Sequence, residues 1–142
     1  MAKSEAMALE NAHFIPSLPK ERMPEALAAA DACIAILKPI DAYKTTFPNK
    51  VFDYMAAGRP VVLVIDGVIR DVVERANAGV FVPPGDPDEL ARAIRRLSDD
   101  PQAVERMGQN GRTHVVGHFD RSALATKMSE VMRELLGENG SG

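Results

Sequence analysis

The stretch "FPNKVFDYMAAGRPVV", residues 47–62, contains the signals for a helix and for the start of a buried strand. Pro48 suits a first helical turn, Gly58 suits a helix end and Pro60 blocks continuation, so a helix is expected between them. The run "VVLVI", residues 61–65, is apolar throughout, which is typical of a strand buried on both faces of a parallel sheet. The stretch therefore predicts a helix that leads into a buried strand.

Similar patterns on either side extend this unit. The run "ACIAIL", residues 32–37, predicts a second strand buried on both faces. After the quoted stretch we expect a helix over residues 69–76 and a short strand over residues 80–82. Strands that alternate with helices indicate an α/β fold, here a Rossmann-like parallel sheet flanked by helices.

The N-terminal region carries weaker signals. We expect a helix over residues 3–10, a short strand at "HFI", residues 13–15, and a helix over residues 21–30 that is kinked near Pro24. In domain terms, residues 1–136 are expected to form one partial domain, and "GENGSG", residues 137–142, a flexible tail.

The C-terminal part predicts three helices. Asp86 is the expected N-cap of the first, with Pro87 in the first turn and Glu89 completing a capping box. Two more helices are expected over residues 101–116 and 122–136. The last one carries an apolar stripe, expected to be core, at Leu124, Met128, Val131 and Leu135.

Composition excludes several classes of protein. The chain has 142 residues, a formal net charge of -3 and a pI near 5.6, so a nucleic-acid partner is not expected. It has no apolar run long enough for a membrane span and no charged-then-apolar leader, which favours a cytoplasmic location. Neither of the glycine-rich phosphate motifs G-x-x-x-x-G-K-[ST] and G-x-G-x-x-G occurs, which disfavours ATPases and common dehydrogenases.

Metal and thiol chemistry are not expected either. The three histidines, at positions 13, 114 and 118, lack the spacing of a metal site. Cys33 is the single cysteine and lies in an apolar run, where thiols are usually inert packing groups. We therefore expect neither a metal nor another cofactor.

The helix of the quoted stretch has one polar side. At 100° per residue, Val51, Phe52, Met55 and Ala56 share one face, and Asn49, Lys50 and Asp53 share the other. Because ligands of open parallel sheets bind beyond the carboxyl ends of the strands, this helix begins at a ligand crevice. The amides after Thr46 can hold phosphate oxygens, Lys50 adds a positive charge, and Asp53 can accept hydrogen bonds from ribose hydroxyls. Phosphates and ribose together predict a nucleotide.

Four segments taken together resemble a known family. In order they are "AAADACIAIL", "FPNKVFDYMAAGRPVV", "GVFVPPGDPDELARAI" and "MGQNGR". They resemble the C-terminal, donor-binding domain of retaining glycosyltransferases of family 4, which have the two-domain GT-B fold. The "FPNK" version resembles a subgroup linked to bacterial surface-polysaccharide assembly. The resemblance implies a truncated C-terminal half of a GT-B fold.

The resemblance also implies particular donor-site residues. In the family two glutamates eight positions apart flank the donor, the first on the sugar and the second on the ribose; Thr45 and Asp53 hold those positions here. Thr45 has no charge and a shorter reach, and Lys50 is expected to compensate. The implied donor-binding residues are Thr45, Thr46, Phe47, Asn49, Lys50 and Asp53, with Tyr54, Asp66 and Gly67 as secondary candidates. No catalytic residue is assigned.

The expected activity is transfer of a sugar from a nucleotide diphosphate donor, expected to be UDP-linked, to a polysaccharide or lipid-linked acceptor. Two alternatives stay open: a nucleotide-sugar epimerase of the same fold, and a non-enzymatic nucleotide-binding module. The implied N-terminal domain, which holds most of the acceptor site, is absent from this chain, so the fragment alone is expected to be inactive. The full-length form is expected in the cytoplasm, with peripheral association at the inner membrane.

The resemblance also implies a six-stranded sheet in the order 3-2-1-4-5-6, of which this chain supplies four strands. Strands one and two are missing between "HFI" and "ACIAIL". Such a gap exposes unpaired backbone groups beside a buried-type strand. We therefore expect either that "HFI" moves beside "ACIAIL" or that the open sheet edge is covered by self-association.

Overall fold

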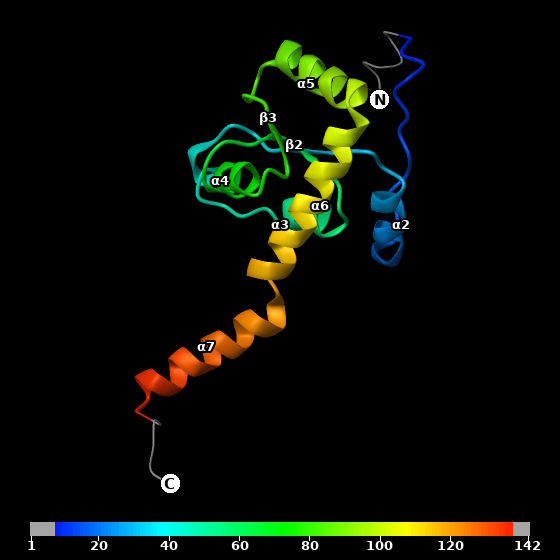
Figure 1. Ribbon diagram of the computed structural model, residues 1–142. Coiled ribbons are helices and arrows are strands. Elements are labelled where there is room, and N and C mark those ends of the chain that lie inside the picture. The colour runs from blue at the N-terminus through cyan, green and yellow to red at the C-terminus, as the bar shows by residue number, and fades with distance from the viewer. Residues whose placement is uncertain (1–7, 138–142) are drawn as a thin grey trace.

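The computed structural model describes residues 8–137, and its elements alternate between helices and strands (Figure 1). In chain order they are a 3-10 turn (Lys20–Arg22), α2 (Met23–Ala28), β1 (Cys33–Ile36), a second 3-10 turn (Asp41–Tyr43), α3 (Asn49–Ala56), β2 (Val61–Val64), α4 (Val68–Arg75), β3 (Gly79–Phe81), α5 (Pro87–Asp99), α6 (Pro101–His118) and α7 (Arg121–Leu135).

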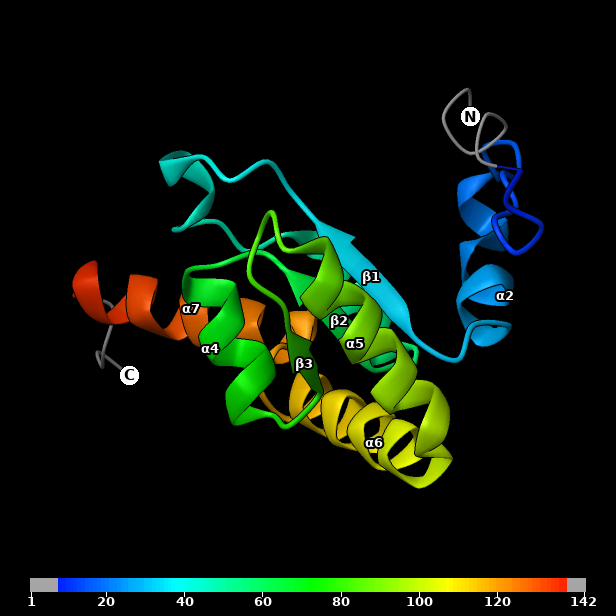
Figure 2. The same cartoon turned by 90° about the horizontal axis from the view of Figure 1, so that it is seen from above.

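The three strands form one parallel sheet in the order β1-β2-β3. Cys33 pairs with Val61, and Val61 in turn pairs with Gly79. Helices α3 and α4 pack on one face of this sheet and α5 on the other (Figure 2). The expected α/β fold with a parallel sheet flanked by helices is confirmed.

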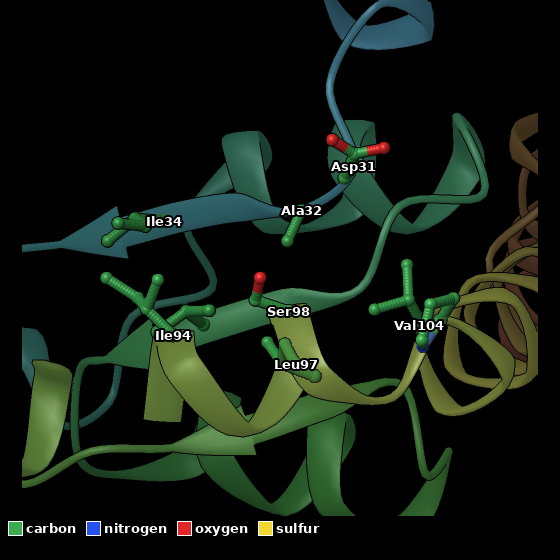
Figure 3. A pocket seen from close by; sticks show the side chains of 9 residues that line it. Asp31, Ala32, Ile34, Ile94, Leu97, Ser98 and Val104 are labelled. Atoms are coloured by element: carbon green, nitrogen blue, oxygen red, sulfur yellow. The ribbon is translucent and has the colours of Figure 1, made fainter. Parts of the chain in front are cut away.

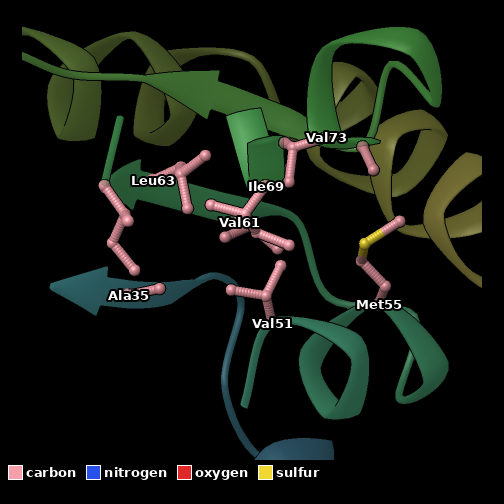
Figure 4. Close-up of a cluster of buried hydrophobic side chains, with 9 residues drawn as sticks. Ala35, Val51, Met55, Val61, Leu63, Ile69 and Val73 are labelled. Atoms are coloured by element: carbon pink, nitrogen blue, oxygen red, sulfur yellow. The ribbon is translucent and has the colours of Figure 1, made fainter. Parts of the chain in front are cut away.

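Strand β2 is the centre of the core. All four of its residues are buried, so the expectation of a strand buried on both faces is confirmed for β2. Its odd-numbered side chains join the cluster of Figure 4, which also holds Val51 and Met55 of α3 and Ile69 and Val73 of α4. Its even-numbered side chains pack against Ala93 and Leu97 of α5.

The same expectation is wrong for β1. This strand alternates, with Cys33 and Ala35 buried and Ile34 and Ile36 exposed, and Ile36 keeps 52% of its surface accessible. The physical reason is position: β1 is the last strand on one side of the described sheet, and α5 packs over β2 and not over β1. An apolar run predicts a strand, but only its neighbours decide whether both of its faces are covered.

Residues 13–15, expected to be a strand, have no regular structure. Ile15 is 77% exposed, and the segment does not pair with β1. The expectation that residues 13–15 pair with the open edge of β1 is therefore wrong. So short a segment, with its side chains exposed, gains too little buried surface to hold it against the sheet. Self-association through this edge stays a prediction.

The helix expected over residues 21–30 is also corrected. The chain makes a 3-10 turn and then starts α2 with Pro24 in its first turn, so Pro24 begins the helix and does not kink it. Of the helix expected over residues 3–10, residues 3–7 lie outside the described part and residues 8–10 are not helical. Of the expected tail, only Gly137 lies among the described residues, as a turn with φ of 70°.

Helix α5 begins as expected, with Asp86 Oδ1 accepting a hydrogen bond from the Glu89 N–H at 2.8 Å. The capping box is only half formed. The Glu89 carboxylate accepts instead from Arg92 Nε at 2.8 Å and from Arg96 Nη2 at 2.7 Å. The Asp86 N–H, which would complete the box, donates instead to the Pro83 carbonyl at 3.2 Å.

Helix α6 crosses α3 at unusually close range. A Cβ atom on Gly108 would lie 2.1 Å from the Gly58 carbonyl oxygen, and one on Gly111 would lie 3.2 Å from Ala78 Cβ. Gly58 itself ends α3 with φ of 70°, as the sequence predicts. The two helices approach this closely because glycine faces backbone at the crossing.

The apolar stripe of α7 is not core. Leu124, Met128, Val131 and Leu135 are all exposed, and α7 extends away from the rest of the described chain (Figure 1). Periodicity correctly predicts a helix with one apolar face. The described chain supplies no surface to cover that face.

We predict that Gly108→Ala destabilises the fold by about 2 kcal/mol, because its new methyl group overlaps the Gly58 carbonyl and forces α6 away from α3. The control is Gly117→Ala on the same helix, where nothing lies within 4 Å and the higher helix propensity of alanine is expected to stabilise by about 0.5 kcal/mol. Urea unfolding followed by circular dichroism measures both. Equal effects of the two substitutions would contradict the close crossing.

Candidate functional site

Helix α3 presents two faces much as its sequence predicts. Val51 and Met55 are fully buried against the sheet, and Asn49, Lys50 and Asp53 are exposed. Phe52 is half-buried, whereas Ala56, expected on the apolar face, is exposed. The polar face of α3 is therefore accessible to a ligand.

The first amides of α3 are available as donors. Pro48 is the N-cap and gives no side-chain cap, and the first backbone bond of the helix runs from the Val51 N–H to the Pro48 carbonyl at 3.0 Å. Among the described residues, the N–H groups of Asn49 and Lys50 have no recorded acceptor. Free amides with the positive end of the helix dipole form a site suited to an anion.

Asn49 and Asp53 lie one helical turn apart and line the same hollow, of about 580 Å³. The opposite wall comes from the end of α6 and the start of α7, through Val115, Phe119 and Leu124. Aromatic rings complete it, with Phe52 lying 4.8 Å from Phe119 and 6.3 Å from Phe47 between ring centroids. We call this the aromatic hollow. It combines a carboxylate and an amide with an apolar wall.

A second hollow, of about 270 Å³, lies at the carboxyl ends of β1 and β2. Its charged lining residues are Lys38, Asp41, Lys44 and Asp66. We call this the strand-end hollow. It occupies the place where open parallel sheets bind ligands, so the expected crevice is present.

Two loops are tied together beside the strand-end hollow. The Val68 N–H donates to the Lys44 carbonyl at 2.8 Å, and a Cβ atom on Gly67 would lie 2.2 Å from that carbonyl oxygen. Gly67 has φ of 110°, which favours glycine. The Asp66 carboxylate accepts from the Gly67 N–H at 2.9 Å, so Asp66 is not a helix cap for α4. The loop before α3 is thereby held against the loop after β2.

Charges in the strand-end hollow are partly paired. Lys44 Nζ lies 2.8 Å from Asp41 Oδ1, and this hydrogen bond raises the pKa of Lys44 and lowers the pKa of Asp41. Arg70 Nη1 lies 3.6 Å from Asp66 Oδ1, while Arg70 Nε makes a shorter bond to Glu74 at 2.7 Å. Lys44 and Asp41 therefore both stay charged near neutral pH.

The structure divides the residues predicted from sequence between these places. Phe47, Asn49 and Asp53 line the aromatic hollow, and Asp66 lines the strand-end hollow. Thr45, Thr46 and Lys50 are exposed but line neither hollow; the Thr46 hydroxyl donates to the Ala42 carbonyl at 3.1 Å. The residues predicted together from the sequence therefore do not share one surface.

Tyr54 is a packing residue. It is half-buried against the main core cluster and lines neither hollow. Burial raises the pKa of its hydroxyl, with smaller contributions from Cys33 and Asp53. Burial likewise raises the pKa of the Cys33 thiol, which keeps the thiol protonated and unreactive.

Several residues of the two hollows were missed from the sequence. Phe119 and Leu124 are far from α3 in sequence and reach the aromatic hollow only because α6 crosses α3. Lys38, Asp41 and Lys44 follow β1 directly, and the rule that ligands bind beyond strand ends could have identified them. No comparable sequence signal marks Phe119.

A third hollow, of about 370 Å³, lies between β1 and the α5–α6 turn (Figure 3). Apolar side chains make up most of its lining, including Ile34, Ile94, Leu97 and Val104, with Asp31 and Ser98 as polar members. None of the predicted site residues lines it.

Within residues 8–137, no helix is both long and apolar enough to cross a membrane. Over the same range, no three side chains of His, Cys, Asp or Glu gather as metal ligands would. His114 and His118 stack with ring centroids 4.5 Å apart, and burial, followed by the charge of His118, lowers the pKa of His114.

Comparisons with known proteins agree with this architecture. The chain is 31% identical over 126 residues to the MMP alpha-(1->4)-mannosyltransferase of Mycolicibacterium hassiacum, a match that covers 87% of this chain and 29% of that protein. The fold of this chain resembles that of sucrose-phosphate synthase from Thermosynechococcus elongatus, with a TM-score of 0.79 and 27% identity. The match covers 97% of this chain and 34% of that protein.

A further structural likeness concerns the fold alone. Anabaena Alr3699/HepE, solved in complex with UDP-glucose, has a TM-score of 0.78 at 22% identity, covering 94% of this chain and 35% of that one. The chain thus spans 29% of the length of the mannosyltransferase and about a third of the length of the two solved structures. These neighbours confirm the expected truncated C-terminal half of a GT-B fold.

A family model described as "Glycosyl transferases group 1" matches residues 1–100. The match covers most of the chain, including the sheet, α3 and both hollows apart from the wall formed by α6 and α7. The chain therefore belongs to the glycosyl transferases group 1 family.

Proposed function

We propose that this chain is part of the donor-binding domain of a glycosyltransferase that transfers a sugar from a nucleotide diphosphate sugar to a polysaccharide or lipid-linked acceptor. The observation that carries the proposal is the start of α3, where free amides stand one turn from an exposed carboxylate in a chain of this family. The Anabaena neighbour in complex with UDP-glucose supports a UDP-linked donor.

Each part of α3 has a role in this proposal. The amides of Asn49 and Lys50, together with the Lys50 ammonium group, stabilise the negative charge that grows on the departing diphosphate. Asp53 accepts hydrogen bonds from the two ribose hydroxyls, because a carboxylate offers two oxygens to vicinal donors. Asn49 shares the aromatic hollow with Asp53 and orients the nucleotide there.

The donor sugar would lie toward the strand-end hollow. Thr45 directly follows Lys44, which lines the strand-end hollow together with Asp41 and Asp66. The Thr45 hydroxyl has a shorter reach than the glutamate that the family has at this position. The charged groups of the strand-end hollow supply the remaining polar contacts to the sugar hydroxyls. The proposal needs no metal ion or other cofactor.

Completion of the site requires more protein than this chain. The acceptor would bind mainly to an N-terminal domain outside these residues, so we expect the chain alone to bind nucleotide weakly and to transfer no sugar. Polysaccharide synthesis, peripheral association with the inner membrane and self-association through the open edge of β1 belong to this proposal as further expectations.

We predict that UDP and GDP bind the 142-residue chain weakly and shift backbone NMR resonances of residues 45–53. The free amides and the ribose acceptor that would contact the ligand lie within this segment. A titration followed by ¹⁵N-resolved spectra measures the shifts. Shifts confined to other parts of the chain would refute the placement of the nucleotide at α3.

Lys50→Gln is expected to weaken UDP binding about threefold to tenfold and to leave uridine binding unchanged, since only the diphosphate contacts the lost ammonium group. Calorimetric or NMR titration of both ligands gives the comparison. The matched control is Lys38→Gln, which removes the same charge at the strand-end hollow and away from α3. Parallel losses for UDP and uridine would contradict a phosphate role for Lys50.

In the full-length protein, Asp53→Ala is expected to weaken donor use by roughly tenfold to a hundredfold, the usual effect of losing a charged hydrogen-bond acceptor. Tyr54→Phe should change donor use little, because Tyr54 packs against the core. Asp71→Ala, on the exposed side of α4, controls for the change in net charge. Donor KM for the three variants decides it, and equal values for Asp53→Ala and the controls would exclude the ribose role.

A further inference from the structure

Arg70 lies in the first turn of α4, beside the strand-end hollow, and is held on three sides. Its guanidinium carbon lies 3.9 Å from the centroid of the Phe81 ring. Its Nε donates to Glu74 Oε1 at 2.7 Å, and its Nη1 lies 3.6 Å from Asp66 Oδ1. A surface arginine usually samples many rotamers, whereas these contacts give Arg70 one defined position.

The Phe81 ring gives the guanidinium group a firm support. Helix α4 packs beside β3, which carries Phe81 (Figure 2). Phe81 is half-buried and packs against the main core cluster, so its ring has little freedom to move. A planar guanidinium group stacks on an aromatic face, which the compact ammonium group of lysine does not do. The support therefore depends on arginine and not only on a positive charge.

The two carboxylates around Arg70 are not equivalent. Glu74 makes a short hydrogen bond, whereas the 3.6 Å separation between Arg70 Nη1 and Asp66 Oδ1 is that of an ion pair. Glu74 therefore anchors the arginine, and the arginine attracts Asp66 without occupying its oxygens. Asp66 keeps its capacity to accept further hydrogen bonds.

Asp66 has one oxygen left for a ligand. Its Oδ1 accepts from the Gly67 N–H at 2.9 Å and faces Arg70, and no group of residues 8–137 donates a hydrogen bond to its Oδ2. Asp66 lines the strand-end hollow, and 52% of its side chain is exposed. A carboxylate oxygen in this place can accept a hydrogen bond from a sugar hydroxyl.

The backbone around Asp66 is fixed as well. Gly67 lies against the Lys44 carbonyl, which accepts a hydrogen bond from the Val68 N–H at 2.8 Å. With the backbone held, the direction of the Asp66 carboxylate depends on its side-chain torsions, which the Gly67 N–H and Arg70 restrict. An acceptor that is already in position loses less conformational entropy when a ligand binds.

We propose that Arg70 is a positioning residue for the donor sugar: it holds the Asp66 carboxylate at the strand-end hollow, where Asp66 accepts a hydrogen bond from a sugar hydroxyl. This role rests on the proposed function, which places the sugar toward this hollow and the nucleotide at α3. Because Arg70 acts through Asp66, its loss weakens the contribution of the sugar to binding and leaves binding of the bare nucleotide unchanged.

The test is calorimetric titration of the full-length protein with nucleotides and with their sugar conjugates. The probes are UDP-glucose, UDP-galactose and UDP-N-acetylglucosamine compared with UDP, and GDP-mannose compared with GDP. For the conjugate that binds most tightly, the Kd of the bare nucleotide divided by the Kd of the conjugate measures the contribution of the sugar. We call this quotient the sugar ratio. Its measurement requires no acceptor.

Arg70→Met removes the charge and keeps an unbranched side chain that can pack on Phe81. This variant is expected to lower the sugar ratio about threefold to tenfold and to leave the Kd of the bare nucleotide unchanged. Asp66→Ala, which removes the acceptor itself, is expected to lower the ratio at least as much. In the Asp66→Ala background, Arg70→Met is expected to have no further effect, because Arg70 acts only through Asp66.

The matched control is Arg75→Met, an exposed arginine at the end of the same helix, which is expected to change neither Kd. Thermal unfolding checks that every variant keeps its fold. An unchanged sugar ratio in Arg70→Met, or additive effects of the two substitutions, would overturn the proposal and leave the proposed function intact. Parallel losses of nucleotide and conjugate in Arg70→Met would also overturn it, since they indicate a general structural role. A protein that binds neither UDP nor GDP would overturn the proposed function and this role of Arg70 with it.

Discussion

Burial of β2 on both faces is the constraint on which the rest of the structure depends. Its side chains point alternately to the two faces of the sheet and pack into two separate clusters, one with α3 and α4 and one with α5. A four-residue strand can serve both only in the centre of a sheet, with helices on either side. The strands pair in parallel because the helix between two successive strands returns the chain to the end of the sheet at which the previous strand began.

The position of α3 results from this core together with the crossing of α6. Val51 and Met55 anchor α3 on the sheet, and Gly108 lets α6 approach the end of α3 without a side chain between them. Because α6 continues to Phe119, the end of α6 reaches the polar side of α3 and forms a wall of the aromatic hollow. A contact between glycines at one end of α3 thus shapes the surface at the other.

The two hollows are linked by backbone and not by shared side chains. The loop that leads into α3 is held against the loop after β2 by the Val68 to Lys44 hydrogen bond and by the absence of a side chain on Gly67. A ligand that spans from the amides of α3 to the strand-end hollow would cross this rigid junction. In the proposed function, that junction fixes the distance between the diphosphate and the donor sugar.

Local patterns in the sequence determined the elements near the centre of the chain. Apolar runs, helix-ending glycines and the Asp86 cap predicted β1, β2, α3 and α5, and the polar face of α3 followed from its periodicity. These features depend only on residue type or on residues within one helical turn, so they can be predicted from the sequence without knowledge of the tertiary structure. The tertiary structure decided which apolar surfaces are covered: Ile34 and Ile36 of β1 and the apolar stripe of α7 stay exposed because no described element lies over them. It also decided that Asn49 and Asp53 share a hollow with Phe119, while Asp66 lines another. Such groupings result from the crossing of helices that are distant in the sequence, so no sequence periodicity predicts them.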